Sequence, residues 1–220
     1  MQGTASKLSA IDRLRAGIAL IGLGLAAPAL AGELHFAGND IVASTAAELA
    51  STIETRRAEF EADRHALYAL VDTLLLPRFD MQRGCRAILA DQWQTSRPGD
   101  RERFVSAFYD YLVASYGDLL LYFKPNTLRV LPFDGDPTES PAHVHTILTM
   151  NDGTEVNVDF VMIERDGEWR VIDIVAEGVS YVRTYRSQFR VDIVTDGLES
   201  VIRWLEQKAA PRTAPGKSSP

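Results

Sequence analysis

The feature that most constrains this 220-residue sequence is a change of hydrophobic period at Pro125-Asn126. Before it, apolar residues recur every three or four positions, which predicts a long helix with one apolar stripe. The stripe consists of Phe104, Phe108, Leu112, Tyr116, Leu119 and Phe123. After it, apolar and polar residues alternate in short segments separated by Gly-containing turns, a pattern typical of antiparallel strands. Helices followed by hairpin-connected strands predict an α+β domain.

The same periodicities place the remaining elements. Helices are expected over residues 41–63, 66–76, 79–91 and from a Pro98-Gly99 turn to Phe123, with Asp100 as a candidate cap. About four strands are expected, over 128–130, 144–150, 156–162 and 169–176. Two closing helices are expected over 180–189 and 197–207. The predicted fold is therefore a set of N-terminal helices packed on a curved antiparallel sheet, followed by these two closing helices.

The first 31 residues have the organisation of an export signal. Three basic residues precede a 15-residue apolar stretch, and the stretch ends at Ala29-Leu30-Ala31, a small-x-small cleavage pattern. Cleavage is expected before Gly32, and a buried helix or a membrane anchor is the alternative. No lipoprotein cysteine lies near this point. The mature domain is expected over 32–208, and a Pro/Ser-rich tail over 209–220 is expected to be disordered.

Composition excludes several classes of function. The formal net charge of −7 gives no basic face for nucleic acid, and one cysteine excludes a disulfide framework or a multi-cysteine zinc site. His143 and His145 share a strand face but have no evident third ligand, so neither metal nor cofactor is expected. Cys85 lies in an apolar helix and is expected to be a buried thiol.

Two stretches carry a family resemblance. The first is Leu75-Leu76-Pro77-Arg78-Phe79-Asp80, followed by Trp93, Arg101, Phe104, Phe108, Leu112, Tyr116 and Tyr122. The second runs from Val158-Asp159-Phe160 through Trp169–Val175 and Glu177-Gly178-Val179-Ser180 to Tyr185-Arg186-Ser187-Gln188-Phe189. Together they resemble the MlaC family, also called toluene-tolerance proteins, over residues 45–207. A departure is that this chain has Ala90-Asp91 where the family usually has a glycine before the tryptophan.

The resemblance implies a cone fold like that of nuclear transport factor 2, around an apolar cavity. It implies a soluble periplasmic carrier that shuttles phospholipid between an outer-membrane lipoprotein–porin complex and an inner-membrane MCE-domain ABC transporter, and so maintains outer-membrane lipid asymmetry. A monomer without catalytic activity is expected. The lipid class stays open, because close relatives occur in hopanoid pathways.

The residues themselves suggest where a lipid would bind. The helix stripe is expected to face the alternating strands, either as plain core or as core at one end and cavity wall at the other. The cavity set is Phe104, Phe108, Leu112, Tyr116, Leu119, Val144, Leu148, Val156, Val158 and Phe160. A basic patch on a closing helix, Arg183, Arg186 and Arg190, is either a contact for phosphate or an acidic partner, or ordinary solvated charge.

Two other classes of function remain open from the residues alone. Cone folds also host isomerases and dehydratases, and Asp173, expected on the same face as Trp169 and Val171, is the candidate general base. The alternative role for Asp173 is a hydrogen-bonded structural acid. An adaptor that only docks partners is the third hypothesis, and it would leave the surplus apolar surface unused.

Overall fold

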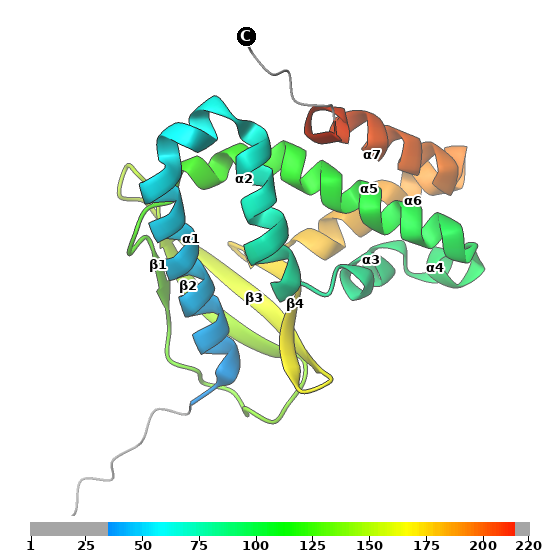
Figure 1. The fold of residues 1–220 in the computed structure, drawn as a ribbon. Coiled ribbons are helices and arrows are strands. Elements are labelled where there is room, and N and C mark those ends of the chain that lie inside the picture. Colours follow the sequence, from blue (N-terminus) through cyan, green and yellow to red (C-terminus); the bar gives the residue numbers. More distant parts are fainter. Residues whose placement is uncertain (1–34, 214–220) are drawn as a thin grey trace, which may run out of the picture. The chain divides into compact units, whose positions relative to one another are not determined.

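Helices pack against a five-stranded antiparallel sheet in the computed structural model, which describes residues 35–213 (Figure 1). The expected signal segment, 1–31, lies outside the described residues. The helices are α1 (Ala37–Ala62), α2 (Arg64–Leu70), α3 (Met81–Leu89), α4 (Asp91–Thr95), α5 (Pro98–Tyr116), α6 (Tyr181–Asp196) and α7 (Leu198–Thr213). Shorter helical turns are η1 (Val71–Leu75), η2 (Leu76–Arg78) and η3 (Gly117–Tyr122). Within residues 35–213, no helix combines the length and hydrophobicity of a membrane span.

The strands follow one another in the sheet in chain order, as hairpin connections dictate. They are β1 (Leu128–Val130), β2 (Ala142–Thr149), β3 (Glu155–Arg165), β4 (Glu168–Ala176) and β5 (Val179–Ser180). The α+β prediction with four strands at these places is confirmed. The two-residue β5 was not expected, because two residues are too few to show an alternating pattern.

Several helix boundaries differ from the sequence expectation; α5, for example, ends at Tyr116 and is followed by η3 instead of continuing to Phe123. Pro98 is not part of a preceding turn but the first residue of α5, where a proline costs no hydrogen bond. The expected 66–76 helix is α2 followed by η1 and η2. The expected tail from residue 209 is wrong at its start, because α7 continues to Thr213 and Ala209 is buried.

The Leu-Leu-Pro-Arg-Phe-Asp segment joins the helices to the sheet. Phe79 forms a parallel bridge with Val171 of β4, and the Asp80 backbone N–H donates to the Val171 carbonyl at 2.9 Å. The buried Asp80 carboxylate accepts from the Arg83 N–H at the start of α3. Its other oxygen is 3.1 Å from Arg165 Nη1. The segment thus determines where α3 begins relative to β4.

Ala90, between α3 and α4, has a backbone conformation that suits glycine. Its φ of 49° and ψ of −118° lie where a Cβ atom clashes with the backbone. The residue is exposed, so its methyl group contributes little packing.

We therefore expect Ala90→Gly to stabilise the protein. Relief of about 1–2 kcal/mol of backbone strain is partly offset by the greater freedom of glycine in the unfolded chain, leaving a gain of about 1 kcal/mol. Thermal melting should show a rise of about 2–4 °C in Tm. Ala87→Gly, inside α3, is the matched control and should lower the Tm. An equal fall in the Tm of both variants would contradict this account of Ala90.

The core of the described residues consists of three large clusters and a small fourth one of Tyr68, Val71 and Val113. A helical cluster joins α3, α5, α6 and α7 around Phe104, Phe108 and Phe189. A sheet cluster gathers around Val144 and Met162, and a third joins α1, α2 and η3. α1 contributes Phe36 and Val42, at its start, to the sheet cluster, but Leu49, Ile53 and Phe60 to the third. The division leaves part of the sheet outside any packed cluster.

Candidate functional site

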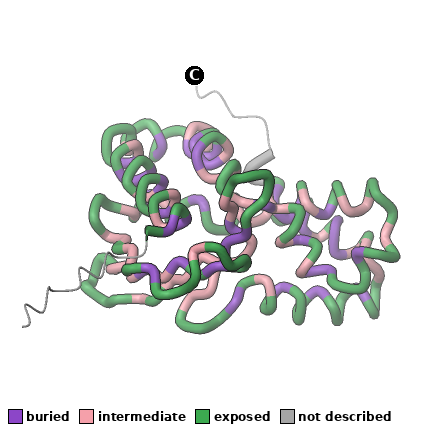
Figure 2. The backbone as a smooth tube through the Cα atoms, turned by 90° about the horizontal axis from the view of Figure 1, so that it is seen from below, coloured by how far each residue is buried: buried purple, intermediate pink, exposed green. Residues whose placement is uncertain are grey.

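The half-buried sheet end is the first candidate surface, and it comprises Leu148, Val156, Val158 and Ala176. The antiparallel register pairs Leu148 with Val156 and Val158 with Ala176, so all four lie on the inner face, the one that carries Val144 and Met162. All four are only half-buried, whereas Val144 and Met162 are fully buried. None of the four belongs to the packed clusters of residues 35–213. Figure 2 shows how buried, intermediate and exposed positions are distributed along the described chain.

A pocket of about 390 Å³ adjoins this sheet end at Ala176. Four tyrosines, Tyr111 and Tyr116 of α5 and Tyr181 and Tyr185 of α6, line it together with Val179, Thr184 and Gln188. The Tyr116 and Tyr185 hydroxyl oxygens lie 3.0 Å apart and join the two helices. Burial, together with this hydrogen bond, raises the pKa of Tyr185, which keeps the phenol neutral. We call this the tyrosine pocket.

The turn at Glu177-Gly178 brings the chain from β4 to β5 and α6 at the edge of this pocket. Both residues have positive φ, 48° and 76°, and glycine adopts this conformation at the second position without strain. Ser180 then caps α6, since its Oγ accepts from the Arg183 N–H at 3.0 Å. Val179, between them, is 58% exposed and lines the pocket. The turn therefore has a structural role, through Gly178 and the Ser180 cap, and also forms part of the pocket rim through Val179.

Asp173 is a structural acid rather than a pocket residue. Its carboxylate accepts from the Ser180 hydroxyl at 2.5 Å and from the Val182 N–H at 3.0 Å, both at the start of α6. A bulge between Val161 and Met162 shifts the register, so that Asp173 pairs with Val161 while Val171 pairs with Met162. The expectation that Asp173 shares a face with Val171 is therefore wrong, because neighbouring residues of β3 point to opposite faces.

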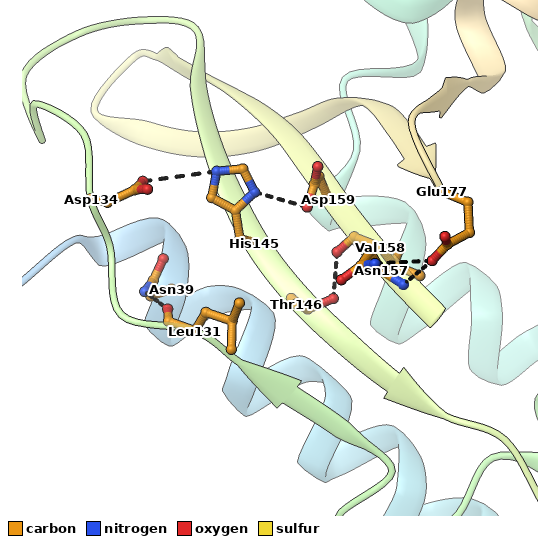
Figure 3. Close-up of polar contacts among 9 residues, drawn as sticks. All are labelled: Asn39, Leu131, Asp134, His145, Thr146, Asn157, Val158, Asp159 and Glu177. Atoms are coloured by element: carbon orange, nitrogen blue, oxygen red, sulfur yellow. Dashed lines mark hydrogen bonds and ion pairs between the residues drawn. The ribbon is translucent and has the colours of Figure 1, made fainter. Parts of the chain in front are cut away.

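The outer face of the sheet is polar around His145. Its Nδ1 lies 2.9 Å from Asp159 Oδ1 and its Nε2 3.8 Å from Asp134 Oδ1 (Figure 3). Asp159 points away from Val158 and Phe160, as alternation predicts. His143 stacks beside His145 at 6.2 Å between ring centroids. Within the described part of the chain, no group of three or more His, Cys, Asp or Glu residues is arranged to hold a metal.

The α5 stripe does not face the strands along its length. Phe104 and Phe108 are buried in the helical cluster, where both rings meet Phe189 edge-to-face, and Leu112 is half-buried against the same cluster. The expectation that this part faces β2 and β3 is wrong, because α7 and α6 cover it. Tyr116 reaches the tyrosine pocket, and Leu119, on η3, is 61% exposed.

The other predicted site residues divide between the sheet cluster, the sheet end and α6. Val144 is fully buried in the sheet cluster, and Phe160 is half-buried against it. Arg183, Arg186 and Arg190 are exposed on α6, and Arg186 Nε donates to the Ala87 carbonyl at 2.6 Å. Cys85 is fully buried, and burial raises the pKa of its thiol, as expected of a structural cysteine.

Sequence reasoning missed the tyrosine pocket. Tyr111, Tyr181 and Tyr185 come from two helices far apart in the chain, so no local pattern unites them. The four-residue spacing of Tyr181 and Tyr185 was the one available signal, since it places both on neighbouring turns of a helix. A second pocket, of about 510 Å³, lies between α3, α4 and α5 around Trp93 and Arg101, whose guanidinium carbon is 5.6 Å from the Trp93 ring centroid.

Comparison with known proteins shows consistent matches. The family described as MlaC protein matches residues 43–207. The toluene tolerance protein ttg2D of Pseudomonas putida is 25% identical over 152 residues, 69% of this chain and 70% of that protein. The intermembrane phospholipid transport system binding protein MlaC of Haemophilus influenzae is 21% identical over 174 residues, 77% of this chain and 81% of that protein.

A solved structure has the same fold. It is the phospholipid-binding protein from Ralstonia solanacearum in complex with a phospholipid, and the TM-score is 0.73 at 21% identity. The match covers 79% of this chain and 97% of that one. The matched family region spans α1 to α7 and contains the sheet end and the tyrosine pocket. The chain belongs to the MlaC family.

Proposed function

We propose that this protein is a soluble periplasmic carrier that binds the tails of a phospholipid at the half-buried sheet end. The observation that carries the proposal is the change of burial along one sheet face. Val144 is fully buried, whereas Val158, one cross-strand pair further along the same face, is only partly buried. Membership of the MlaC family, and relatives named for phospholipid transport and binding, support a lipid as the occupant.

The energetics of lipid transfer explain why an apolar surface is required. A two-tailed lipid has about 30 methylenes, each worth about 0.8 kcal/mol on leaving water, or about 24 kcal/mol together. Diffusion of the free lipid through water is therefore negligible. A protein that covers the tails returns most of this free energy, so exchange with a bilayer becomes nearly neutral.

Membership of the MlaC family supports a proposal for the route of the lipid. We propose that the protein moves between an outer-membrane lipoprotein–porin complex and an inner-membrane MCE-domain ABC transporter, and so maintains outer-membrane asymmetry. Arg183, Arg186 and Arg190 are proposed to contact phosphate or an acidic partner. They are exposed on α6, the helix that also forms a wall of the tyrosine pocket, in a chain of net charge −7.

The enzyme hypothesis receives less support. A general base must reach a substrate proton, but both Asp173 carboxylate oxygens already accept hydrogen bonds from the start of α6. A carrier of a hopanoid-type lipid remains the alternative within the same function, because an apolar sheet end does not itself distinguish acyl chains from fused rings.

We expect the full chain, expressed in a bacterium and purified natively from the periplasm, to carry a two-chain lipid. Native mass spectrometry with lipid extraction identifies the lipid. The intact mass of the same sample determines the first residue of the mature protein, which is expected to be Gly32. Protein stripped of lipid should reload from liposomes. A protein that is lipid-free after native purification and takes up none from liposomes would rule out the proposed function, and a cytoplasmic protein that retains Met1 would rule out export.

A further inference from the structure

We infer that the tyrosine pocket binds the cationic ammonium group of a zwitterionic lipid headgroup, such as choline or ethanolamine. The inference rests on the proposed function for the lipid itself but adds the class of headgroup. The first observation is the composition of the pocket wall: half of the eight lining residues are tyrosines, and none carries a charge. An ammonium group is attracted to the negative face of an aromatic ring, and aromatic cages recognise quaternary ammonium groups in this way.

The pocket tyrosines pack against one another in two edge-to-face pairs. The Tyr116 and Tyr181 centroids are 6.4 Å apart with an interplanar angle of 77°, and Tyr111 and Tyr185 are 6.1 Å apart at 88°. Tyr116 and Tyr181 are about two-fifths exposed, at 39% and 40%, so parts of their rings stay accessible to a ligand, whereas Tyr185 is buried.

The hydrogen bond between Tyr116 and Tyr185 keeps the pocket in shape without giving it charge. It links α5 to α6 across the pocket, and the raised pKa of Tyr185 keeps the phenol neutral at physiological pH. A neutral cage attracts a cation through the ring quadrupoles and has no guanidinium or ammonium group among its lining residues to bind a lone anionic head.

The position of the pocket fits a headgroup. Ala176 belongs both to the pocket and to the half-buried sheet end, where it pairs with Val158. A lipid with its tails on the sheet end would thus have its head at the tyrosines. The volume of about 390 Å³ is at the lower end of the range for small-molecule sites and matches a headgroup better than two acyl chains.

The test compares headgroups on identical acyl chains. Lipid-stripped protein is incubated with liposomes of phosphatidylcholine, phosphatidylethanolamine or phosphatidylglycerol, and the load is measured by native mass spectrometry. We expect the first two to load about 5-fold more than phosphatidylglycerol. Tyr181→Leu should bring this ratio close to 1, and Tyr181→Phe, which keeps the ring, should preserve it. Tyr122→Leu, an exposed tyrosine that is not among the pocket residues, is the matched control and should also preserve it.

A second measurement separates the headgroup inference from lipid carriage. Soluble phosphocholine and glycerol phosphate are titrated into the lipid-free protein and followed by NMR of ¹³C-labelled tyrosine rings. We expect shifts of the pocket tyrosines with phosphocholine only. Equal loading of all three lipids, or no response to phosphocholine, overturns the inference and leaves the proposed function standing. A response to phosphocholine in a protein that loads no lipid supports the inference and overturns the proposed function.

Discussion

Val158→Asp should leave the domain folded and remove its lipid, whereas Val144→Asp should prevent folding. The two valines lie on the same face of paired strands, one cross-strand pair apart, so they differ in burial and not in residue type or secondary structure. Val144 has no exposed surface, and an unpaired carboxylate there costs several kcal/mol, a large share of the total stability of a domain. Val158 is only partly buried, so water can reach the new charge.

The amount of bound lipid shows whether Val158 belongs to a binding surface or only to a sheet edge at which a charge is tolerated. If the tails lie against Val158, a carboxylate there must be dehydrated whenever lipid binds, and we expect the load to fall at least 10-fold. Circular dichroism melting and native mass spectrometry on the same preparation measure both effects. Val158→Leu, which keeps the site apolar, should keep the lipid. A folded Val158→Asp protein with the wild-type load would show that the sheet end is not the tail site.

Hydrophobic period was sufficient to predict which segments are helices and which are strands. The change at Pro125 separates α5 and η3 from the sheet, and the Asn151-Asp152-Gly153 and Asp166-Gly167 turns lie where the hairpins between β2, β3 and β4 lie. Turn residues and alternation are local properties, so a sequence displays them directly. The burial of Cys85 was predictable for the same reason, because Met81, Ile88 and Leu89 lie on its side of the helix at spacings of three and four.

The partners of each element were harder to predict, because packing depends on residues distant in the chain. A stripe on α5 shows which face is buried but not whether α7 or the sheet covers it, and here α7 and α6 do so at Phe104 and Phe108. Asp173 was misplaced for a different reason. One extra residue at the bulge reverses which face later residues occupy, and no signal in β4 shows it.

Phe104→Ala is expected to destabilise the domain strongly without changing the lipid load of the folded protein. The Phe104 side chain is fully buried between α5 and α6, with its ring centroid 5.9 Å from that of Phe108 and 6.0 Å from that of Phe189. Truncating a buried phenylalanine leaves a cavity and costs about 3–5 kcal/mol. For a domain of this size the Tm should fall by about 6–20 °C.

Leu119→Ala is the matched control, because Leu119 belongs to the same sequence stripe but is 61% exposed on η3. We expect it to change the free energy of unfolding by less than about 0.5 kcal/mol. Phe104→Ala and Leu119→Ala together distinguish the two hypotheses for the apolar stripe, which is either plain core or core at one end and cavity wall at the other. If Phe104 is core, its removal lowers the Tm and spares the lipid measured at low temperature, where the variant stays folded. If Phe104 bordered the lipid, its removal would reduce the load at nearly unchanged Tm, because the lost contacts would be with lipid rather than with Phe108 and Phe189. That second result would place the tails between the helices instead of on the sheet end.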